Sequence, residues 1–408
     1  MSTVPKFAAF GFRDYRIFWF GQLISLSGTW MQSVAQGWLV YSLTESPFYL
    51  GMVAAAGSLP ILLFTLIGGI TADRFKKRNV LLLTQALSII PALSLGVLTG
   101  TGMVEVWHVA VLAAFLGAVN AFDIPARQAF LVDLVGKPNL TNAIALNSAA
   151  FHSSRMIGPV IAGILIAYIG LPACFYLNAV SFIAVIFALT KIRTEGRGNG
   201  KSNGILMDFI EGIQFIRNKP EIYRIITLIA LFSLVGIPFI NLLPVFAEKI
   251  FEAGPEGFGF LVGATGAGAV AAALSLAIRG DVQNKQRFIV CSALFFSVLL
   301  FVFSLSENYH FSIAVLVGIG WSLVSLLATA NSYIQHVVPD NLRGRAMSVF
   351  TLVFLGTAPI GNAILGVMAD AITTPAAISI AAVVCIGASL LFVLTHLGQK
   401  GPRLTSES

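Results

Sequence analysis

Polar side chains recur at helical spacing within apolar stretches of this chain, and they are the residues with the clearest chemical potential. The first stripe follows alternating steps of three and four residues: Gln22, Ser25, Thr29, Gln32 and Gln36. Residues at these steps share one face of an α-helix. Amides and hydroxyls recognise a polar guest by hydrogen bonding, and they are not bond-breaking groups on their own. We expect this face to line a wet cavity and contact a substrate, with hydrogen bonding between helices as the alternative.

A second stripe runs through a later apolar stretch and includes Ser325 and Thr329. Asn120 begins a shorter stripe that continues with Asp123 and Arg127, and Asn241 lies seven residues before Glu248 in a further apolar stretch. Polar groups that face lipid are costly, so these side chains should face protein or water. The predicted substrate contacts among them are Ser325, Thr329, Asn120 and Asn241. Packing between helices is the alternative for the small hydroxyl residues.

Three charged residues lie within or at the edge of apolar stretches. Asp123 and Arg127 are four residues apart on one helical face. Asp123 is predicted to carry a coupled proton, which requires Arg127 to leave it in one conformation; a permanent structural ion pair is the alternative. Arg155 is predicted to attract an anionic substrate group or a carbonyl oxygen, with a structural pairing or snorkelling toward the interface as the alternative.

The sequence contains no arrangement typical of an enzyme or a metalloprotein. The three cysteines are far apart in apolar runs, and the five histidines have no metal-ligand spacing. The glycine-rich run 263–268 resembles a nucleotide loop, but no strand precedes it and no lysine follows it. We therefore expect no catalytic residue, no metal and no cofactor.

The elements that must position these residues follow from composition. Of 408 residues, 57% are hydrophobic and 11% are charged, and the mean hydropathy is +0.87. A soluble globule of this length would lack a polar surface. A membrane-spanning helix needs about 20 apolar residues, and the sequence predicts an all-α membrane protein with twelve such helices. Their expected ranges are 16–42, 48–71, 80–100, 107–131, 140–168, 171–190, 222–246, 256–278, 287–305, 311–335, 344–368 and 375–397.

The basic residues indicate one orientation. Of the 25 Lys and Arg residues, all except Lys249 and Arg155 fall before, after or between the spans on a single side. The positive-inside rule then places both termini in the cytoplasm, as expected for a multi-pass protein of a bacterial cytoplasmic (inner) membrane. The net charge of +7 reflects this sidedness, so no nucleic-acid partner is expected. No cleavable signal peptide is expected either.

The chain is predicted to consist of two pseudo-symmetric six-helix halves, at 1–190 and 221–397. Gly158-Pro159 corresponds to Ala358-Pro359 at an offset of 200 residues, and Asp73 corresponds to Asp281 at an offset of 208. A polar linker at 191–220 joins the halves and carries a short amphipathic helix, either as a tether or as a regulator; residues 398–408 form a cytoplasmic tail. Duplicated halves with a site between them are typical of transporters.

The loop after the second span resembles the signature loop of the major facilitator superfamily. It reads Gly69-Ile70-Thr71-Ala72-Asp73-Arg74-Phe75-Lys76-Lys77-Arg78, with Lys76 where a second glycine is usual. The resemblance implies that Gly69, Asp73, Arg74 and Arg78 gate the cytoplasmic side; a pure topology signal is the alternative. It also implies that spans one, four, seven and ten line a central cavity.

Residues 120–163 resemble the enterobactin-exporter-like, or transmembrane secretion effector, branch of this superfamily. The stretch contains Asp123-Ile124-Pro125-Ala126-Arg127 and Arg155-Met156-Ile157-Gly158-Pro159. Gly158 and Pro159 would form a kink that keeps the halves sealed, with simple packing as the alternative.

This resemblance implies secondary active export of a siderophore, drug or similar small amphipathic molecule. We expect a monomer in the lipid bilayer that works as a proton antiporter by alternating access. The alternatives are an importer, a lipid or lysophospholipid transporter of the same fold, and a transport-inactive receptor.

Overall fold

The computed structural model describes residues 7–196, 205–280 and 282–397. Within these ranges the regular structure is helical and no strand occurs, which confirms the predicted all-α class. Asp281, the linker residues 197–204 and the tail at 398–408 lie outside the described residues.

The first half begins with a short 3-10 helix and continues with five longer helices. They are η1 (Ala8–Gly11), α1 (Arg13–Thr44), α2 (Pro47–Arg74), α3 (Lys77–Gly100), α4 (Val106–Tyr168) and α5 (Leu171–Lys191). Helix α4 contains two predicted spans joined at Gly136, whose backbone has φ 72° and ψ 164°. Glycine adopts this left-handed φ without a steric penalty, and the chain reverses direction there.

The second half is less regular. Its elements are α6 (Ile205–Arg217), α7 (Pro220–Leu231), η2 (Phe232–Gly236), η3 (Ile237–Leu242), α8 (Leu243–Val245), η4 (Phe246–Ile250), α9 (Gly254–Arg279), α10 (Lys285–Ser304), α11 (Tyr309–Val337), α12 (Asp340–Gly356), α13 (Ala358–Ala371) and α14 (Thr374–Leu397). Elements α7 to η4 form one span, in which π-helical turns at η2 and η4 flank a 3-10 segment. Pro238 and Pro244 each remove a backbone donor in this span, which explains why it is not a regular α-helix.

The lengths and hydropathies agree with a multi-pass membrane protein. Among the described residues, ten helical segments are long and apolar enough to cross a membrane. One of them is the 63-residue α4, which supplies two spans, and α1 is long enough at 32 residues. Helix α1 is less apolar than these segments because three of its residues are glutamines. The twelve predicted spans are therefore present in the part of the chain that the structure describes.

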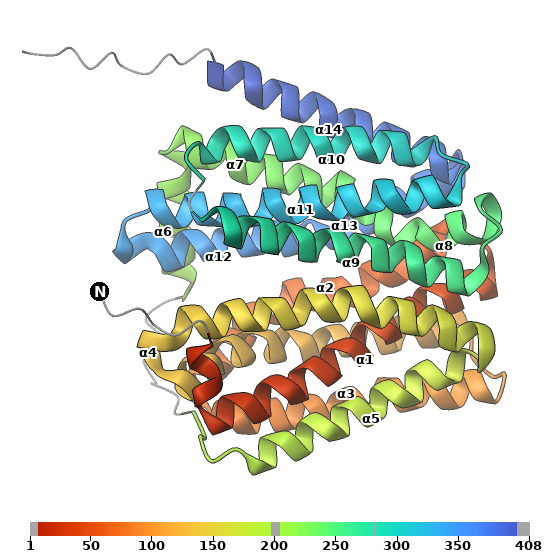
Figure 1. Ribbon diagram of the computed structural model, residues 1–408, viewed down its shortest axis with the longest axis horizontal. Coiled ribbons are helices and arrows are strands. Elements are labelled where there is room, and N and C mark those ends of the chain that lie inside the picture. Colours follow the sequence, from red (N-terminus) through yellow and green to blue (C-terminus); the bar gives the residue numbers. More distant parts are fainter. Residues whose placement is uncertain (1–6, 197–204, 281, 398–408) are drawn as a thin grey trace, which may run out of the picture.

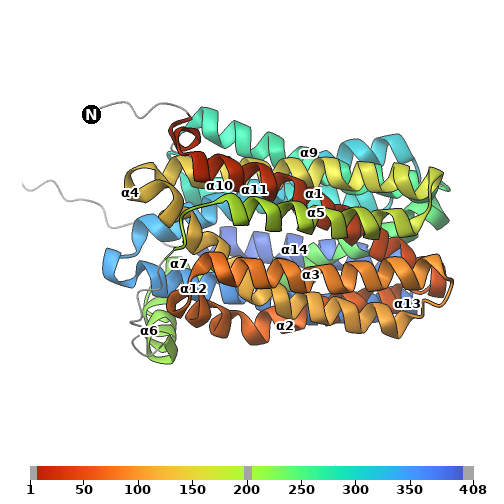
Figure 2. The same ribbon diagram turned by 90° about the horizontal axis from the view of Figure 1, so that it is seen from below.

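The spans form two bundles that lie side by side (Figure 1). Helices α1 to α5 make one bundle and α7 to α14 the other, and in the view from below the first bundle lies in front of the second (Figure 2). One end of the molecule, here termed the basic end, carries Arg74, Lys76 and Arg78. The opposite end, termed the far end, carries Glu45, Lys249 and Asp370.

Glycines bring the two bundles into backbone contact toward the far end. A Cβ at Gly51 of α2 would overlap the carbonyl oxygen of Asn362 in α13 and lie 2.7 Å from the Cα of Gly366. Gly163 of α4 and Gly259 of α9 make a similar contact, with a Cβ at Gly163 only 3.0 Å from the Cα of Gly259. Small residues allow this approach between helices, and it closes the molecule on that side.

Polar contacts at the far end join the same two bundles. The Ser46 hydroxyl donates to Asp370 Oδ1 at 2.7 Å, and Lys249 Nζ lies 3.9 Å from Glu45 Oε2. The lysine is also 5.8 Å from the centre of the Tyr41 ring. These contacts come from segments more than 200 residues apart, so they depend on the relative position of the two halves.

Helix α6 packs against the second half at the basic end. Gly212 contacts the backbone of Arg345 in α12, Ile216 is buried, and Glu211 pairs with the Arg345 side chain. The predicted helix is therefore present, but one of its faces meets α12. The side chains of Leu206, Phe209 and Ile210, which carry part of the predicted apolar face, lie outside the described residues.

Candidate functional site

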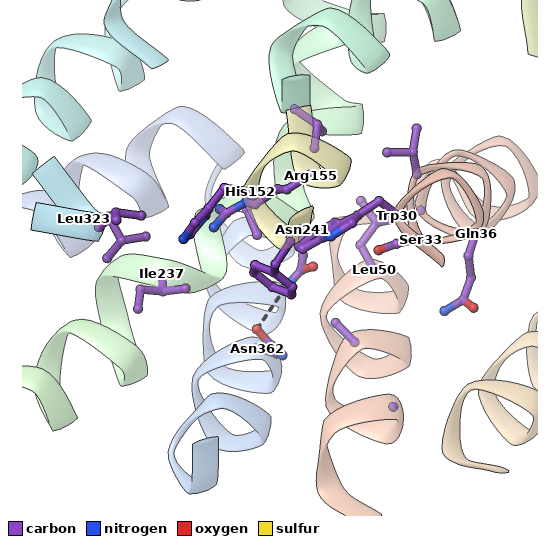
Figure 3. Close-up of a pocket in the computed structure, with 18 of the residues that line it drawn as sticks. Trp30, Ser33, Gln36, Leu50, His152, Arg155, Ile237, Asn241, Leu323 and Asn362 are labelled. Atoms are coloured by element: carbon purple, nitrogen blue, oxygen red, sulfur yellow. Dashed lines mark hydrogen bonds between the residues drawn. The ribbon is translucent and has the colours of Figure 1, made fainter. Parts of the chain in front are cut away.

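A cavity of about 720 Å³ lies between the two halves, within the membrane-spanning region. Its wall combines helices from both bundles: α1, α2 and the second part of α4 on one side, and η3, α9, α11, α12 and α13 on the other. Figure 3 shows side chains from these helices pointing into one shared space. A cavity of this size accommodates a drug-sized molecule.

Arg155 and His152 form the charged part of the wall. They are three residues apart on α4 and therefore share a helical face. The guanidinium carbon of Arg155 lies 5.4 Å from the centre of the Trp30 ring, which itself packs edge-on against Phe151. Arg155 Nε and His152 Nδ1 are buried and have no hydrogen-bond partner among the described residues. Figure 3 shows Trp30, His152 and Arg155 beside one another.

An amide pair from the second half faces the same cavity. Asn241 Nδ2 donates to Asn362 Oδ1 at 2.9 Å, which is the dashed contact in Figure 3. Asn241 lies in the 3-10 segment η3, directly between the two π-helical turns. Irregular turns of this kind often occur at functional sites because they reorient side chains and free backbone groups. The local break at Pro238 and Pro244 therefore positions this polar group.

Of the five residues in the first predicted stripe, Gln36 lines the cavity. The other four are not among its lining residues, and Gln22, Ser25 and Gln32 contact other helices of the first bundle. Gln32 Oε1 accepts a bond of 2.6 Å from Asn178 Nδ2 in α5, and Thr29 Oγ1 donates to the Ser25 carbonyl at 2.9 Å. The cavity face of α1 is instead shifted around the helix, and it carries Trp30, Ser33, Val34, Gln36, Gly37 and Val40.

Gln22, Asp123 and Arg127 form one buried network between helices. Arg127 donates through Nη1 to Gln22 Oε1 and through Nη2 to Asp123 Oδ2. The other carboxylate oxygen of Asp123 accepts bonds from Thr84 at 2.8 Å and Gln85 at 2.9 Å. The carboxylate is thus satisfied on both oxygens. This network connects α1, α3 and α4 and lies outside the residues that line the cavity.

The predicted stripe on α11 is buried, but it does not line the cavity either. Ser325 is fully buried and Thr329 is 3% exposed, and neither hydroxyl has a partner among the described residues. The neighbouring face of α11 supplies Leu323, Val324, Leu327, Ala328 and Asn331 to the cavity. The implied role of span four in the wall is also not found, since none of the described lining residues lies within 107–131, and Asn120 is partly buried elsewhere.

The predicted gate residues separate into two places. Gly69, Asp73 and Arg74 lie at the basic end of α2, with Asp73 and Arg74 exposed. Arg78 donates to the carbonyl of Ile192 at 3.0 Å, and Lys76 pairs with Glu195 at 2.7 Å, so this loop holds the segment that follows α5. Asp14 contacts the same segment.

Asp14 accepts bonds of 3.0 Å from the backbone of Arg193 and Thr194 and 2.9 Å from the Thr194 hydroxyl. Partial burial opposes ionisation of Asp14, but these hydrogen bonds outweigh it, so the pKa of the carboxyl is lowered. The start of the linker is therefore attached to the first half at the basic end.

Gly158 and Pro159 lie where three helices meet. A Cβ at Gly158 would be 2.7 Å from the carbonyl of Ser27 and 2.9 Å from Trp30 Cβ in α1. The carbonyl of Pro159 faces Gly259 of α9, at 2.5 Å from the position of a Cβ there. This pair thus contacts both halves next to the cavity wall.

Trp30, His152, Asn331 and Asn362 are not among the predicted site residues, and the structure places all four in the wall. His152 precedes Arg155 by one helical turn, which was an available signal. Asn362 is an amide inside an apolar span, like Asn241, to which it bonds. No cluster of three or more potential metal ligands occurs in the described part of the chain.

Comparison with known proteins places this architecture among transporters. The chain is 27% identical over 366 residues to a staphyloferrin A transporter of Staphylococcus aureus, covering 87% of this chain and 89% of that protein. It is 26% identical to the multidrug efflux pump Tap of Mycolicibacterium fortuitum, with 86% and 88% covered. It is 23% identical to the enterobactin exporter EntS of Escherichia coli, with 96% and 95% covered.

Solved structures share the fold. A POT family transporter superposes with a TM-score of 0.78 at 12% identity, over 95% of this chain and 97% of that one. A D-xylose-proton symporter superposes with a TM-score of 0.72 at 13% identity, over 93% and 96%. The family model described as transmembrane secretion effector matches residues 4–405. The chain therefore belongs to the transmembrane secretion effector family, a group of major facilitator superfamily transporters.

Proposed function

We propose that this protein exports a small amphipathic molecule by alternating access. The observation that carries the proposal is the central cavity of about 720 Å³, whose wall comes from both halves and is mostly apolar with a few polar groups. The names of its relatives, a staphyloferrin A transporter, a multidrug efflux pump and an enterobactin exporter, support export of small molecules. Contacts between the halves at Gly51 and Gly163 close the far end.

In this proposal the protein lies in a bacterial cytoplasmic membrane with both termini and the basic end in the cytoplasm. The basic loops favour this orientation. The far end then faces outward, and the cavity receives substrate from the cytoplasmic side in the conformation described. Opening requires the Gly51 and Gly163 contacts to separate while the basic end closes. Gly69, Asp73 and Arg74 belong to the moving surface at that end.

The proposed driving force is an inward proton gradient. One elementary charge that crosses 100 mV supplies about 2.3 kcal/mol, and about 1.4 kcal/mol corresponds to a tenfold ratio. A single proton can thus sustain roughly a fifty-fold concentration ratio. Asp123 with Arg127 is the proposed coupling pair. The substrate contacts are proposed to come from Gln36, Arg155 and Asn241, which line the cavity.

The test compares three strains of the source bacterium. In the first the gene for this protein is deleted, in the second the deletion strain produces the unaltered protein, and in the third it produces a variant whose cavity is filled by a larger side chain. Val53→Trp inserts bulk into the cavity wall and serves as the inactive control. Mass spectrometry of cells and culture medium should show at least one compound that accumulates in the deletion cells and returns to the medium only with the restored chain. A compound taken up from the medium only in the restored strain would instead identify an importer.

A further inference from the structure

We propose that the substrate is an amphipathic organic anion whose carboxylate, or an equivalent acidic group, binds between Arg155 and His152. This inference rests on the proposed transport function and specifies the substrate class of the same cavity. The described part of the cavity wall carries a net positive charge. Among the described residues that line the cavity, Arg155 carries the permanent charge, His152 is titratable, and there is no Asp or Glu.

Arg155 lacks the partner that a buried guanidinium normally has. None of the ion pairs in the described part of the chain involves it, and its Nε has no hydrogen-bond partner there. Its guanidinium carbon lies over the face of the Trp30 ring, 5.4 Å from the ring centre. A charge in a membrane-spanning segment is expensive without a counter-charge, and it commonly marks a substrate pathway. An anionic guest supplies the missing counter-charge.

The contrast with Arg127 shows that this is not the general state of arginines in the chain. Arg127 is paired with Asp123, which itself accepts bonds from Thr84 and Gln85. That carboxylate neutralises the charge within the protein. Arg155 faces a cavity instead, so its partner must come from solution.

The geometry suits a planar acidic group. Arg155 and His152 lie one helical turn apart on the same face of α4, and His152 Nδ1 is also buried without a partner among the described residues. A carboxylate has two oxygens, and a guanidinium offers several donors in a fixed fork. One carboxylate oxygen can accept a hydrogen bond from the Arg155 guanidinium, while the other lies against the His152 imidazole.

The rest of the wall explains why the anion should be amphipathic. Val34, Val53, Phe258 and Leu323 supply apolar surface, and the aromatic side chains of Trp30 and Phe151 lie beside the charged pair. The Asn241–Asn362 pair lies on the other half and can bond a hydroxyl or carbonyl at a distance from the acidic group. A cationic drug, in contrast, would enter a cavity that already carries a positive charge and offers no carboxylate.

The experiment uses three probes of nearly equal shape and different charge: pyrenebutyrate, its methyl ester and pyrenebutylamine. Binding to the full chain in lipid nanodiscs is measured by energy transfer from tryptophan to pyrene, with empty nanodiscs subtracted. Because hydrogen bonds to charged groups are stronger than those between neutral groups, we expect the anion to bind at least about tenfold more tightly than the ester or the ammonium. Equal binding of the three probes, or tightest binding of the ammonium, overturns the proposal.

Substitutions of Arg155 test whether this residue binds the anion. Arg155→Gln should weaken pyrenebutyrate binding about tenfold or more and leave the ester within about twofold, whereas Arg155→Lys should lose less because it keeps the charge. Arg287→Gln removes a matched charge from an exposed position outside the cavity and should change neither probe. Unchanged anion binding in Arg155→Gln overturns the assignment. The comparison of probes on the unaltered protein remains decisive if this variant does not fold.

A transport assay separates this inference from the proposed function. Proteoliposomes that contain the full chain receive pyrenebutyrate and an imposed proton gradient. Charge-selective binding without gradient-driven movement refutes the exporter and supports the anion site. Export of a neutral or cationic compound that is unaffected by Arg155→Gln, measured in the restored strain, supports the exporter and refutes the anion site.

Discussion

At the residue scale, neighbours decide the role of each polar side chain. Gln32 and Gln36 are one helical turn apart on α1, yet Gln36 faces the cavity and Gln32 bonds to Asn178 of α5. Asp123 and Arg155 are both charged groups of α4, yet both carboxylate oxygens of Asp123 are hydrogen-bonded and Arg155 lines the cavity. Substitutions at similar polar residues of one helix should therefore affect either stability or substrate binding, depending on the neighbours of each residue.

Replacing the two glutamines should separate recognition from stability. Gln36→Leu should weaken the binding of pyrenebutyrate and leave the thermal midpoint of unfolding unchanged, because its amide lines the cavity. Gln32→Leu should lower the midpoint, since it leaves the buried Asn178 amide without its partner. Hydrogen bonds between membrane helices contribute about 0.6–2 kcal/mol. A loss of binding in Gln32→Leu at unchanged stability would return Gln32 to the substrate site.

Changing Asp123 should uncouple transport from the proton gradient. Asp123→Asn keeps the shape of the side chain and removes its charge, so Arg127 loses its counter-ion. In the proposed mechanism the coupled proton then has no carrier. We expect proteoliposomes with this variant to lose gradient-driven accumulation of pyrenebutyrate and to keep energy-independent exchange. Full proton-driven accumulation would eliminate Asp123 as the carrier and leave a purely structural ion pair with Arg127.

At the element scale, the helices meet through glycines that leave no room for a side chain. The contacts of α2 with α13 and of α4 with α9 connect the two halves and close the far end. The span from α7 to η4 is the most irregular, and its break places Asn241 in the cavity wall. Helix α6 and the loop around Arg78 attach the linker to opposite halves.

Bulk at Gly51 should shift the conformational equilibrium. Gly51→Leu overlaps α13 in the conformation described and costs about 1–3 kcal/mol there, as overpacking generally does. The conformation in which the two bundles are separated at the far end then becomes more populated. The measurement is labelling of Asn331→Cys, in the cavity wall, by a membrane-impermeant maleimide added outside cells. The background carries Cys174→Ala, Cys291→Ala and Cys385→Ala.

The matched control is Gly387→Leu, because a Cβ at Gly387 meets nothing within 4 Å. Labelling should rise in Gly51→Leu and stay unchanged in Gly387→Leu. Equal labelling in the two variants would show that the contact between α2 and α13 does not govern access to the cavity.

At the scale of the whole molecule, two bundles enclose one cavity and are joined at the far end. The walls of the cavity belong to different halves, so any change in the angle between the bundles changes both its access and its contacts. The division into two halves suits the proposed alternating access, in which one bundle moves against the other around the site between them.

The orientation can be tested with single cysteines in the same cysteine-free background. Thr101→Cys lies between α3 and α4 and should react with an impermeant maleimide in intact cells. Asn284→Cys, before α10, should react only after the membrane is opened. The basic loops predict this difference, and labelling of the second position in intact cells would reverse the proposed orientation.

The class of protein and the order of its spans follow from the amino-acid sequence. Continuous apolar runs of about 20 residues can satisfy their backbone hydrogen-bonding groups in a membrane only as helices, so the positions of these runs predict the twelve spans. The sidedness of the basic residues predicts the orientation. The signature loop at 69–78 and the stretch at 120–163 indicate the family, which the match over residues 4–405 confirms.

Only the tertiary structure decided which polar face meets the cavity. Periodicity shows that Gln22, Gln32 and Gln36 share a face of α1, but it contains no information about the helix that this face meets. The close approach of α5 buries Gln32, and the rotation of α11 turns Leu323 and Asn331, rather than Ser325, toward the cavity. Arg155 is the proposed anion contact because it lines the cavity and has no ion-pair partner among the described residues, and such long-range neighbours are set by how the helices pack rather than by local sequence.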